Sequence, residues 1–269
     1  MDPNLLEEAI KDRIAKTGRT PKAIIPVYLY GMPARIDDIM EIANRYGIPV
    51  VEDSAEAFGS RYRGRLCGTF GQFGIMSFNG NKMITTSGGG ALICPDEATK
   101  KKTMFYATQS REPMPYYLHK EIGYNYRMSN ICAGIGRGQM TVLDEHLAHH
   151  RHLCDCYVEL LGDVDGITVH TNPDDRCDSN YWLNTILIDP KRAGVDYEAV
   201  RLHLEACNIE SRPLWKPMHT QPVFQGAPSY VNGVSEGLFS MGLCLPSGPW
   251  VSDEDVERVA GEIKSCCNK

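Results

Sequence analysis

The sequence lacks the features of membrane, secreted and nucleic-acid-binding proteins. It contains no run of eighteen apolar residues, so no transmembrane helix is expected. Its N-terminus is acidic and has no apolar segment of the kind found in signal peptides. The 269 residues carry a formal net charge of −6, which argues against a surface for nucleic acid or an anionic membrane. We therefore expect a cytoplasmic globular protein with no membrane or nucleic-acid partner.

Paired-cysteine and metal motifs are also missing. None of the ten cysteines forms a Cys-x-x-Cys pair, and most fall within apolar runs, as Cys94 does. We expect reduced core cysteines of a cytosolic protein rather than a disulfide framework. His146 and His150 have the spacing of helical metal ligands, but no carboxylate accompanies them in a Glu-x-x-His arrangement. A solvated helix face is the simpler interpretation, and no metal is predicted.

The glycine-rich segment Gly88–Gly90 does not fit a Walker or Rossmann phosphate loop, because the required glycine spacings are absent. Three glycines allow a sharp turn and a close approach of the backbone to another group. A tight turn into the next strand would account for them equally well.

The first half of the chain contains a β-α-β pattern. A buried strand is predicted over 23–30, a helix over 36–46 that closes at Gly47, and a second buried strand over 48–51. This unit favours a parallel sheet covered by helices. Functional groups gather at the carboxyl ends of such strands, where Asp53 stands.

The remaining elements suggest a large domain over 1–150 and a small α+β domain over 151–269. The predicted elements are strands at 73–78, 90–94 and 181–188, helices at 129–161, 197–207 and 253–267, and an extended segment at 209–214.

Lys82 is the most informative residue. It lies in a loop flanked by glycines, about thirty residues after the strand-borne Asp53. Pyridoxal phosphate chemistry needs such a pair: a lysine amine that forms a Schiff base with the cofactor, and a carboxylate that keeps the pyridine nitrogen protonated. Asp53 could instead be a helix N-cap.

Five segments resemble the DegT-type (DegT/DnrJ/StrS) nucleotide-sugar aminotransferases, in the family's order and over nearly the whole chain. They are 52–59, 77–82, 123–128, 210–219 and 244–248. The Asn-Gly-Asn-Lys loop and the Arg-Pro-Leu-Trp-Lys-Pro-Met-His run look most like the branch that makes UDP-4-amino-4,6-dideoxy-N-acetylglucosamine, the bacillosamine precursor. The resemblance implies an α/β protein of fold type I, an aspartate aminotransferase-like fold with a mostly parallel sheet.

The resemblance also implies roles for residues around the cofactor. Lys82 would be the cofactor lysine and Asp53 the pyridinium partner. Glu56 would lie near the cofactor O3′, and Ser77 would bind the phosphate, although a strand-end serine could simply satisfy backbone groups. Asn125 matches an asparagine that reaches the partner's cofactor phosphate, which implies a homodimer with shared active sites.

Substrate contacts are expected from the same resemblance. Arg127 is either a substrate or phosphate contact or an ion-pair residue. Trp215, Lys216 and His219 would border the sugar-nucleotide pocket, and Arg212 would bind the carboxylate of the donor, L-glutamate. An exposed loop with a buried tryptophan would look much the same.

The chain departs from the family at its N-terminus. Family members are normally longer there and carry a helix start that cradles the cofactor phosphate. We therefore expect a truncated chain whose large-domain sheet lacks strands. Two hypotheses follow: a pyridoxal-phosphate-dependent aminotransferase, or a catalytically impaired remnant that acts as an interaction module. Lys82 disfavours a third, a lysine-lacking dehydratase relative.

Overall fold

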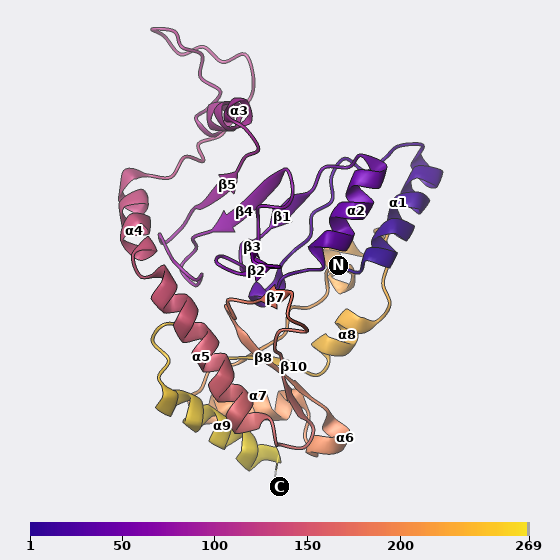
Figure 1. Cartoon of the computed structure of the whole chain (residues 1–269), viewed down its shortest axis with the longest axis vertical. Helices are drawn as coiled ribbons and strands as arrows, with labels where there is room; N and C mark the ends of the chain where they lie inside the picture. Colours follow the sequence, from indigo (N-terminus) through magenta and orange to yellow (C-terminus); the bar gives the residue numbers. More distant parts are fainter. Residues whose placement is uncertain (268–269) are drawn as a thin grey trace.

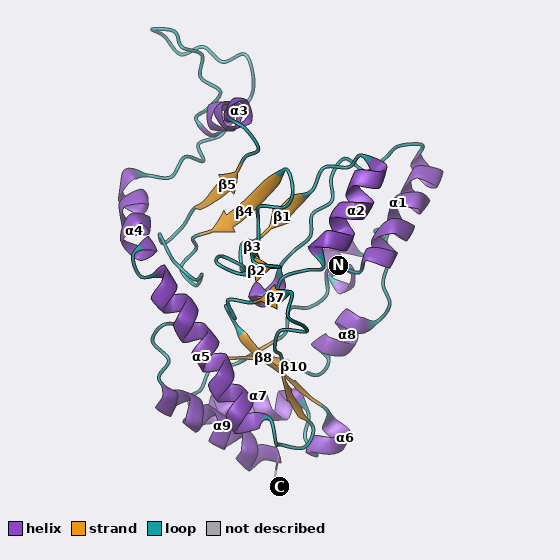
Figure 2. Ribbon diagram, in the orientation of Figure 1, coloured by secondary structure: helices purple, strands orange, loops and turns teal. Residues whose placement is uncertain are grey.

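The computed structural model describes residues 1–267, and its N-terminal half is built on a three-stranded sheet. The strand order is β1-β4-β5, with β1 and β4 parallel and β4 and β5 antiparallel. The strands span Val51–Asp53 (β1), Phe73–Ser77 (β4) and Gly90–Ile93 (β5). Figures 1 and 2 show this sheet beside the first two helices.

The segment 23–30 does not form the continuous strand that was predicted. It runs parallel to β1 only through isolated bridges, Ile24 to Val50 and Val27 to Asp53. Pro26 has no N–H to donate, and Tyr30 adopts a positive φ of 58° within the 3₁₀ turn Leu29–Gly31. The β-α-β crossover is nevertheless present, because the helix α2 (Ile36–Tyr46) lies between the two parallel segments and ends at Gly47, where φ is 65°.

Helices α1 (Pro3–Thr17) and α2 cover this unit. Ile10 of α1 and Ile36 and Ile39 of α2 share one buried cluster with Tyr28 and Val50. Helix α1 had not been predicted; it begins with Asp2, whose side chain accepts a hydrogen bond from the N–H of Asn4.

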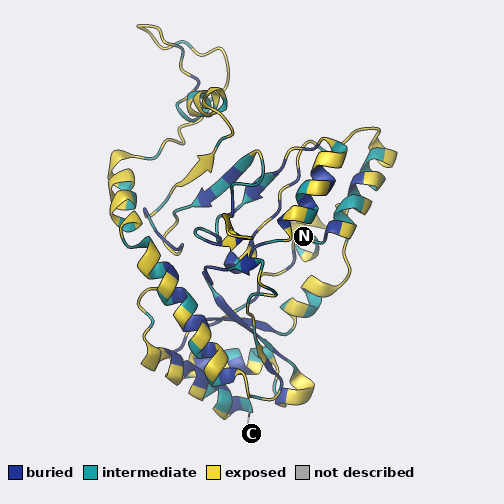
Figure 3. Ribbon diagram, in the orientation of Figure 1, coloured by how far each residue is buried: buried dark blue, intermediate teal, exposed yellow. Residues whose placement is uncertain are grey.

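Residues 94–140 extend away from both cores. Helices α3 (Glu97–Ala107) and α4 (Asn130–Met140) contain no buried residue. Between them lies a segment, residues 108–129, which we call the arm. Figures 1 and 3 show it projecting from the body of the molecule, coloured largely as exposed.

The C-terminal half forms an antiparallel sheet of order β6-β8-β10-β9 packed against three helices. One buried cluster joins the sheet to the helices. The elements are β6 (Ile167–Val169), β8 (Asn184–Ile188), β9 (Arg212–Pro213), β10 (Gly242–Leu245), α5 (Leu143–Leu161), α7 (Tyr197–Ala206) and α9 (Asp253–Cys267). The helices predicted at 197–207 and 253–267 are confirmed, and the predicted helix at 129–161 is divided into α4 and α5.

Short elements complete the chain. A small sheet of order β3-β2-β7 links the two halves, because β7 pairs with β2 from the first half. The bounds are β2 (Arg61–Tyr62), β3 (Arg65–Leu66), β7 (Cys177–Asp178), α6 (Pro190–Ala193), α8 (Val234–Phe239) and the 3₁₀ turns Met218–Thr220 and Pro222–Phe224. Each half has one large buried cluster, and a smaller one joins Tyr30 of the first half to Trp182, Leu214 and Cys244 of the second. The division at residue 150 stays a prediction.

No helix among residues 1–267 combines the length and apolar character needed to cross a membrane. All ten cysteines lie in this described part and none is in a disulfide, and five of them are buried.

Candidate active site

The carboxyl ends of β1 and β4 carry two polar side chains on the same face of the sheet. Asp53 lies opposite Ile75 in the parallel register. Opposite residues share a face, and every second residue along a strand returns to that face, so Ser77 joins Asp53 there. Both residues are half-buried. The edge predicted from the β-α-β pattern therefore brings together the two predicted cofactor contacts from different strands.

Glu52 faces the opposite, buried side of β1, and the sequence analysis assigned it no role. Its carboxylate accepts a 2.5 Å hydrogen bond from the Tyr28 hydroxyl. It also accepts backbone N–H groups of Gly68 at 2.8 Å, Phe70 at 2.5 Å and Gly71 at 2.6 Å. Four donors around a fully buried carboxylate make Glu52 a structural anchor for the loop before β4. The signal in the sequence was the acidic pair itself, since neighbours on a strand point to opposite faces.

Lys82 is held between an acid and an aromatic ring. Its Nζ lies 3.4 Å from Glu56 Oε1 and 3.9 Å from the centre of the Trp182 ring. The side chains of Lys82 and Glu56 are each 14% exposed, so this pair is shielded but still reachable. The other oxygen of Glu56 accepts the N–H of Tyr30 at 2.8 Å, which fixes the carboxylate toward the lysine.

Trp182 is a site residue that the sequence analysis missed. Its indole N–H donates to the carbonyl of Asn81 at 2.6 Å, which ties the lysine loop to the segment before β8. The neighbouring Asn180 donates its amide to the carbonyls of Glu56 and Phe58, both at 2.9 Å. The segment before β8 therefore positions Lys82 and the Glu56 loop together. The aromatic pair at 181–182 could have indicated a site residue, but it is equally typical of a buried strand.

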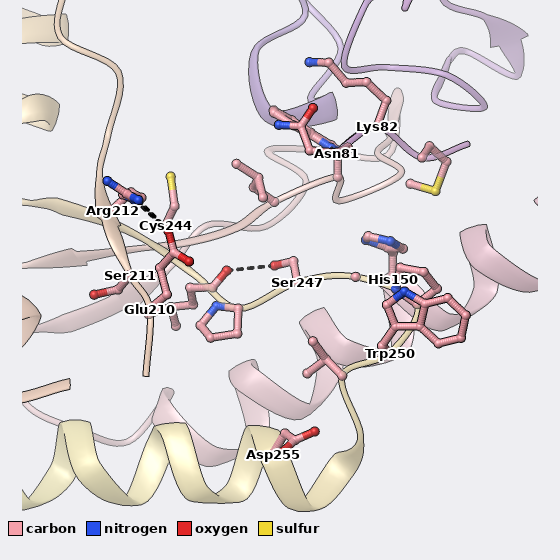
Figure 4. Close-up of a pocket in the computed structure, with 18 of the residues that line it drawn as sticks. Asn81, Lys82, His150, Glu210, Ser211, Arg212, Cys244, Ser247, Trp250 and Asp255 are labelled. Atoms are coloured by element: carbon pink, nitrogen blue, oxygen red, sulfur yellow. Dashed lines mark hydrogen bonds and ion pairs between the residues drawn. The ribbon is translucent and has the colours of Figure 1, made fainter. Parts of the chain in front are cut away.

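A cavity of about 1220 Å³ opens beside Lys82, as Figure 4 shows. Two of the predicted substrate residues, Arg212 and Trp215, line it. The backbone N–H of Trp215 donates to the Tyr30 hydroxyl at 2.7 Å, and its ring lies 6.5 Å from that of Trp182. The Arg212 guanidinium pairs with Glu210 at 2.6 Å and is well exposed, so it lies at the edge of the cavity.

Two titratable groups in the cavity wall are neutral near pH 7. Burial lowers the pKa of His150 to about 4, although its Nδ1 contacts the carbonyl of Tyr181 at 3.0 Å. Burial raises the pKa of Cys244 to about 12. The interpretation of His146 to His152 as a solvated face is wrong for His150, because α5 packs this side chain against the segment before β8.

Seven of the ten predicted site residues do not line the cavity: Asp53, Glu56, Ser77, Asn125, Arg127, Lys216 and His219. Lys216 is exposed, and His219 lies at the 3₁₀ turn with its Nε2 2.7 Å from Glu236. Asn125 and Arg127 are exposed in the arm, where the backbone of Asn125 bridges to Thr108. Within this chain, therefore, the arm contributes nothing to the cavity at Lys82.

A comparison with known protein families decides which chemistry this arrangement serves. The family model described as "DegT/DnrJ/EryC1/StrS aminotransferase family" matches residues 1–264. The chain belongs to this family. Family members are transaminases that depend on pyridoxal phosphate, so the predicted family, fold type I and cofactor class are confirmed.

Individual relatives support the same assignment. EpsN of Bacillus subtilis (strain 168), to which a pyridoxal phosphate-dependent aminotransferase activity is provisionally ascribed, is 47% identical over 96% of this chain and 66% of its own length. GDP-perosamine synthase of Escherichia coli O157:H7 is 36% identical over 97% of this chain and 70% of its own length. A DegT DnrJ EryC1 StrS aminotransferase from Brucella abortus superposes with a TM-score of 0.89 at 29% identity, covering 100% of this chain and 70% of that protein. The chain thus spans about two thirds of the length of these relatives.

The residues present fit pyridoxal phosphate. Lys82 offers a shielded amine with one long polar contact, at 3.4 Å. Asp53 and Ser77 offer a carboxylate and a hydroxyl on one face of the neighbouring strands. The hydroxyl of Ser211, in the cavity wall, is buried without a hydrogen-bond partner among the described residues and could accept or donate to a bound molecule.

Proposed function

We propose that the chain is an aminotransferase that moves the amino group of L-glutamate to the keto carbon of a nucleotide-linked 4-keto-6-deoxy sugar. The observation that carries the proposal is the placement of Lys82. Lys82, which matches the cofactor lysine of the family, lies beside Glu56 and over the Trp182 ring. Its loop follows β4, whose carboxyl end carries Ser77 on the same face as Asp53 of β1. Bound pyridoxal phosphate would supply an aldehyde that condenses with amines and a ring that accepts an electron pair.

Each residue has a distinct task in this proposal. In each half of the reaction, Lys82 Nζ would move a proton between the substrate carbon, first of glutamate and then of the sugar, and C4′ of the cofactor. Glu56 and Trp182 hold that amine in position, from two sides. Asp53 would keep the ring nitrogen of the cofactor protonated, and Ser77 would donate a hydrogen bond to its phosphate. Arg212 would receive the glutamate carboxylate, and the ring of Trp215 lies in the cavity wall.

The decisive experiment reduces the purified chain with borohydride in the presence of pyridoxal phosphate and maps the labelled residue. We expect the label on Lys82 and loss of the absorption band near the visible-violet boundary. Label on another lysine, or none at all, would contradict the assignment. A labelled Lys82 without amino transfer would instead favour the alternative, a catalytically impaired remnant or interaction module.

We propose UDP-4-keto-6-deoxy-N-acetylglucosamine as the acceptor, which makes the product the bacillosamine precursor. The support is the Asn79–Lys82 loop and the 212–219 run, which look most like that branch. GDP-perosamine synthases are also among the relatives, so a GDP-linked 4-keto sugar is the competing acceptor. Turnover with the UDP-linked and GDP-linked sugars, each with glutamate, separates the two. We further propose that the enzyme works in the cytoplasm, in keeping with its ten thiols outside any disulfide.

We propose a homodimer in which the arm completes the partner's site. Supporting this, the arm and α4 expose large apolar side chains: Tyr116 (61%), Tyr117 (73%), Ile122 (84%), Tyr126 (76%) and Ile131 (78%). Asn125 lies on this same arm. Mixing Lys82→Ala chains with Asn125→Ala chains should restore activity, because one site of the mixed dimer is intact. If mixed dimers form but activity is not restored, Asn125 does not contribute to the partner's site.

A further inference from the structure

The C-terminal helix α9 packs against two other helices, α5 and α7 (Figure 1), and its N-terminal part lines the cavity that opens beside Lys82. Its buried residues Val256, Val259 and Ile263 join Leu204 of α7 and Leu153 of α5 in one core cluster. This packing fixes the relative positions of side chains that face each other across the helices. Polar groups at the edges of these contacts are therefore held in place before any ligand binds.

Three side chains of metal-ligand type meet between α7 and α9. His203 and Cys207 lie four residues apart, one turn along α7 and its C-terminal cap. Glu262 of α9 faces them, with its Oε2 2.9 Å from His203 Nε2. The imidazole nitrogen, the thiol sulfur and a carboxylate oxygen all lie within 4.8 Å of one another. Ser265, one turn further along α9, places its hydroxyl 3.2 Å from the same imidazole nitrogen.

The cluster is sheltered and already interconnected. The side chains of His203 and Glu262 are only 24% and 34% exposed, and Cys207 is half-buried. The Glu262 carboxylate lies 2.9 Å from His203 Nε2, and the Cys207 sulfur lies within 4.8 Å of both groups. The backbone carbonyl of Cys207 accepts a 2.5 Å hydrogen bond from Arg258 of α9, which fixes the C-terminus of α7.

We propose that His203, Cys207 and Glu262 bind one divalent transition-metal ion of the zinc class, which links α7 to α9. An imidazole, a thiolate and a carboxylate are the three ligand types that zinc takes in proteins, whereas magnesium and calcium avoid sulfur. One thiolate and one carboxylate balance the charge of a divalent ion. The fourth ligand is a water molecule or the Ser265 hydroxyl. On binding, the thiol proton leaves to solvent as the metal–sulfur bond forms.

None of the three proposed ligands lines the cavity at Lys82, so the metal proposal does not rest on the proposed transamination. It differs from the expectation of no metal. That expectation examined His146 and His150, whereas the present ligands come from two helices that only the fold brings together. A donor that is distant in sequence, Glu262, completes a histidine–cysteine pair that is unremarkable on its own.

The molecule contains its own control for this proposal. His152 and Cys156 of α5 have the same spacing, and His152 Nε2 lies 2.8 Å from Asp253 at the start of α9. The side chains of His152 and Asp253 are 51% and 60% exposed, so this second cluster lacks the shelter of the first. If spacing alone sufficed, both clusters would bind equally well.

Cobalt(II) is the spectroscopic probe of choice, because a bound thiolate gives a charge-transfer band. The full chain is stripped with a chelator under reducing conditions and titrated with Co²⁺, and Zn²⁺ is then added to displace it. We expect one sheltered equivalent with a thiolate band, lost in Cys207→Ser and kept in Cys156→Ser. A band that is missing in the unmodified chain, or that survives Cys207→Ser unchanged, would overturn the proposal.

Thermal unfolding gives an independent readout that does not depend on the thiol. Zn²⁺ should raise the melting temperature of the unmodified chain and of Asp253→Asn, but not that of Glu262→Gln. Zn²⁺ affinity should fall on the order of 100-fold in Glu262→Gln. Each variant is compared with its own metal-free form, so a loss of intrinsic stability does not obscure the result. An equal zinc-induced shift in Glu262→Gln would contradict the site.

Discussion

The two main sheets of this molecule differ in how completely the chain covers them. All four residues of β10 are buried, and four of the five residues of β8 are buried beside it. All four residues of β5, by contrast, are exposed. Figure 3 shows the same contrast between the lower sheet and the upper one.

The well-covered C-terminal sheet contributes mainly to stability, whereas the proposed chemistry lies at the less covered N-terminal sheet. The C-terminal sheet has its own helices on its apolar surface, so its core forms from this chain alone. The N-terminal sheet bears Asp53 and Ser77, and Lys82 lies in the loop between β4 and β5. Its strand β5 and the arm are left uncovered by the described chain. An uncovered strand edge invites pairing with other protein surface, which agrees with the proposed dimer. The active site is thus predicted to depend on the less protected half.

The largest effect should come from Lys82→Ala. Loss of the amine removes both cofactor attachment and proton transfer, so we expect turnover to fall by about 10³-fold or more. The melting temperature should change little, because the half with the larger covered core is untouched. Transaminase assays and thermal unfolding measure the two quantities, with the exposed Lys191→Ala as a control. Comparable turnover in the two variants would show that Lys82 is not the catalytic lysine.

A pair of leucine substitutions tests the contrast in burial directly. Leu243 of β10 is 0% exposed and Leu92 of β5 is 41% exposed. Leu243→Ala should lower the free energy of unfolding by about 2–5 kcal/mol, because it leaves a cavity in a closed core. Leu92→Ala should stay within about 0.5 kcal/mol. Urea denaturation of both variants measures the difference, and a large loss in Leu92→Ala would show that β5 is covered in solution.

His150 should make stability depend on pH. Its folded pKa of about 4 lies below the ordinary 6.5, so the unfolded chain takes up the proton first as the pH falls. Its contribution is fully present above pH 6.5 and is lost as the pH drops from 6.5 toward 4. The loss amounts to about 3 kcal/mol.

Urea denaturation across this pH range should give a flatter profile for His150→Asn than for the exposed control His152→Asn. If stability depends on pH equally in the two variants, the pKa of His150 does not differ between the folded and the unfolded chain.

The adjacent acids Glu52 and Asp53 give the finest comparison. Glu52→Gln leaves backbone donors facing an amide, so the free energy of unfolding should fall by about 1.5–3 kcal/mol. Asp53→Asn should leave stability within about 0.5 kcal/mol but reduce turnover, since an amide cannot hold the pyridinium proton. Stability and kinetics are measured on both variants. If Asp53→Asn mainly weakens folding, Asp53 is a cap rather than a cofactor partner.

Local sequence patterns determined a large part of this protein. The spacing of Ile36, Ile39 and Ala43 predicted α2, and the acidic start at Asp253 predicted α9, because helix periodicity and capping are properties of neighbouring residues. Five short segments, among them those of Asp53 and Lys82, carried the resemblance to the family. Each of these signals lies within a few residues, where the sequence can be read directly.

Only the tertiary structure decided which groups meet. Trp182 reaches Lys82 across a hundred residues, and Glu262 meets His203 from another helix. Packing also decided that Glu52, rather than Asp53, faces the buried side of β1, and the low pKa of His150 follows from its burial. Such contacts depend on how separate elements pack. The residues around one position in the sequence do not show which distant residue it will contact. The sequence therefore specified the elements and the reactive residues, whereas packing specified their surroundings.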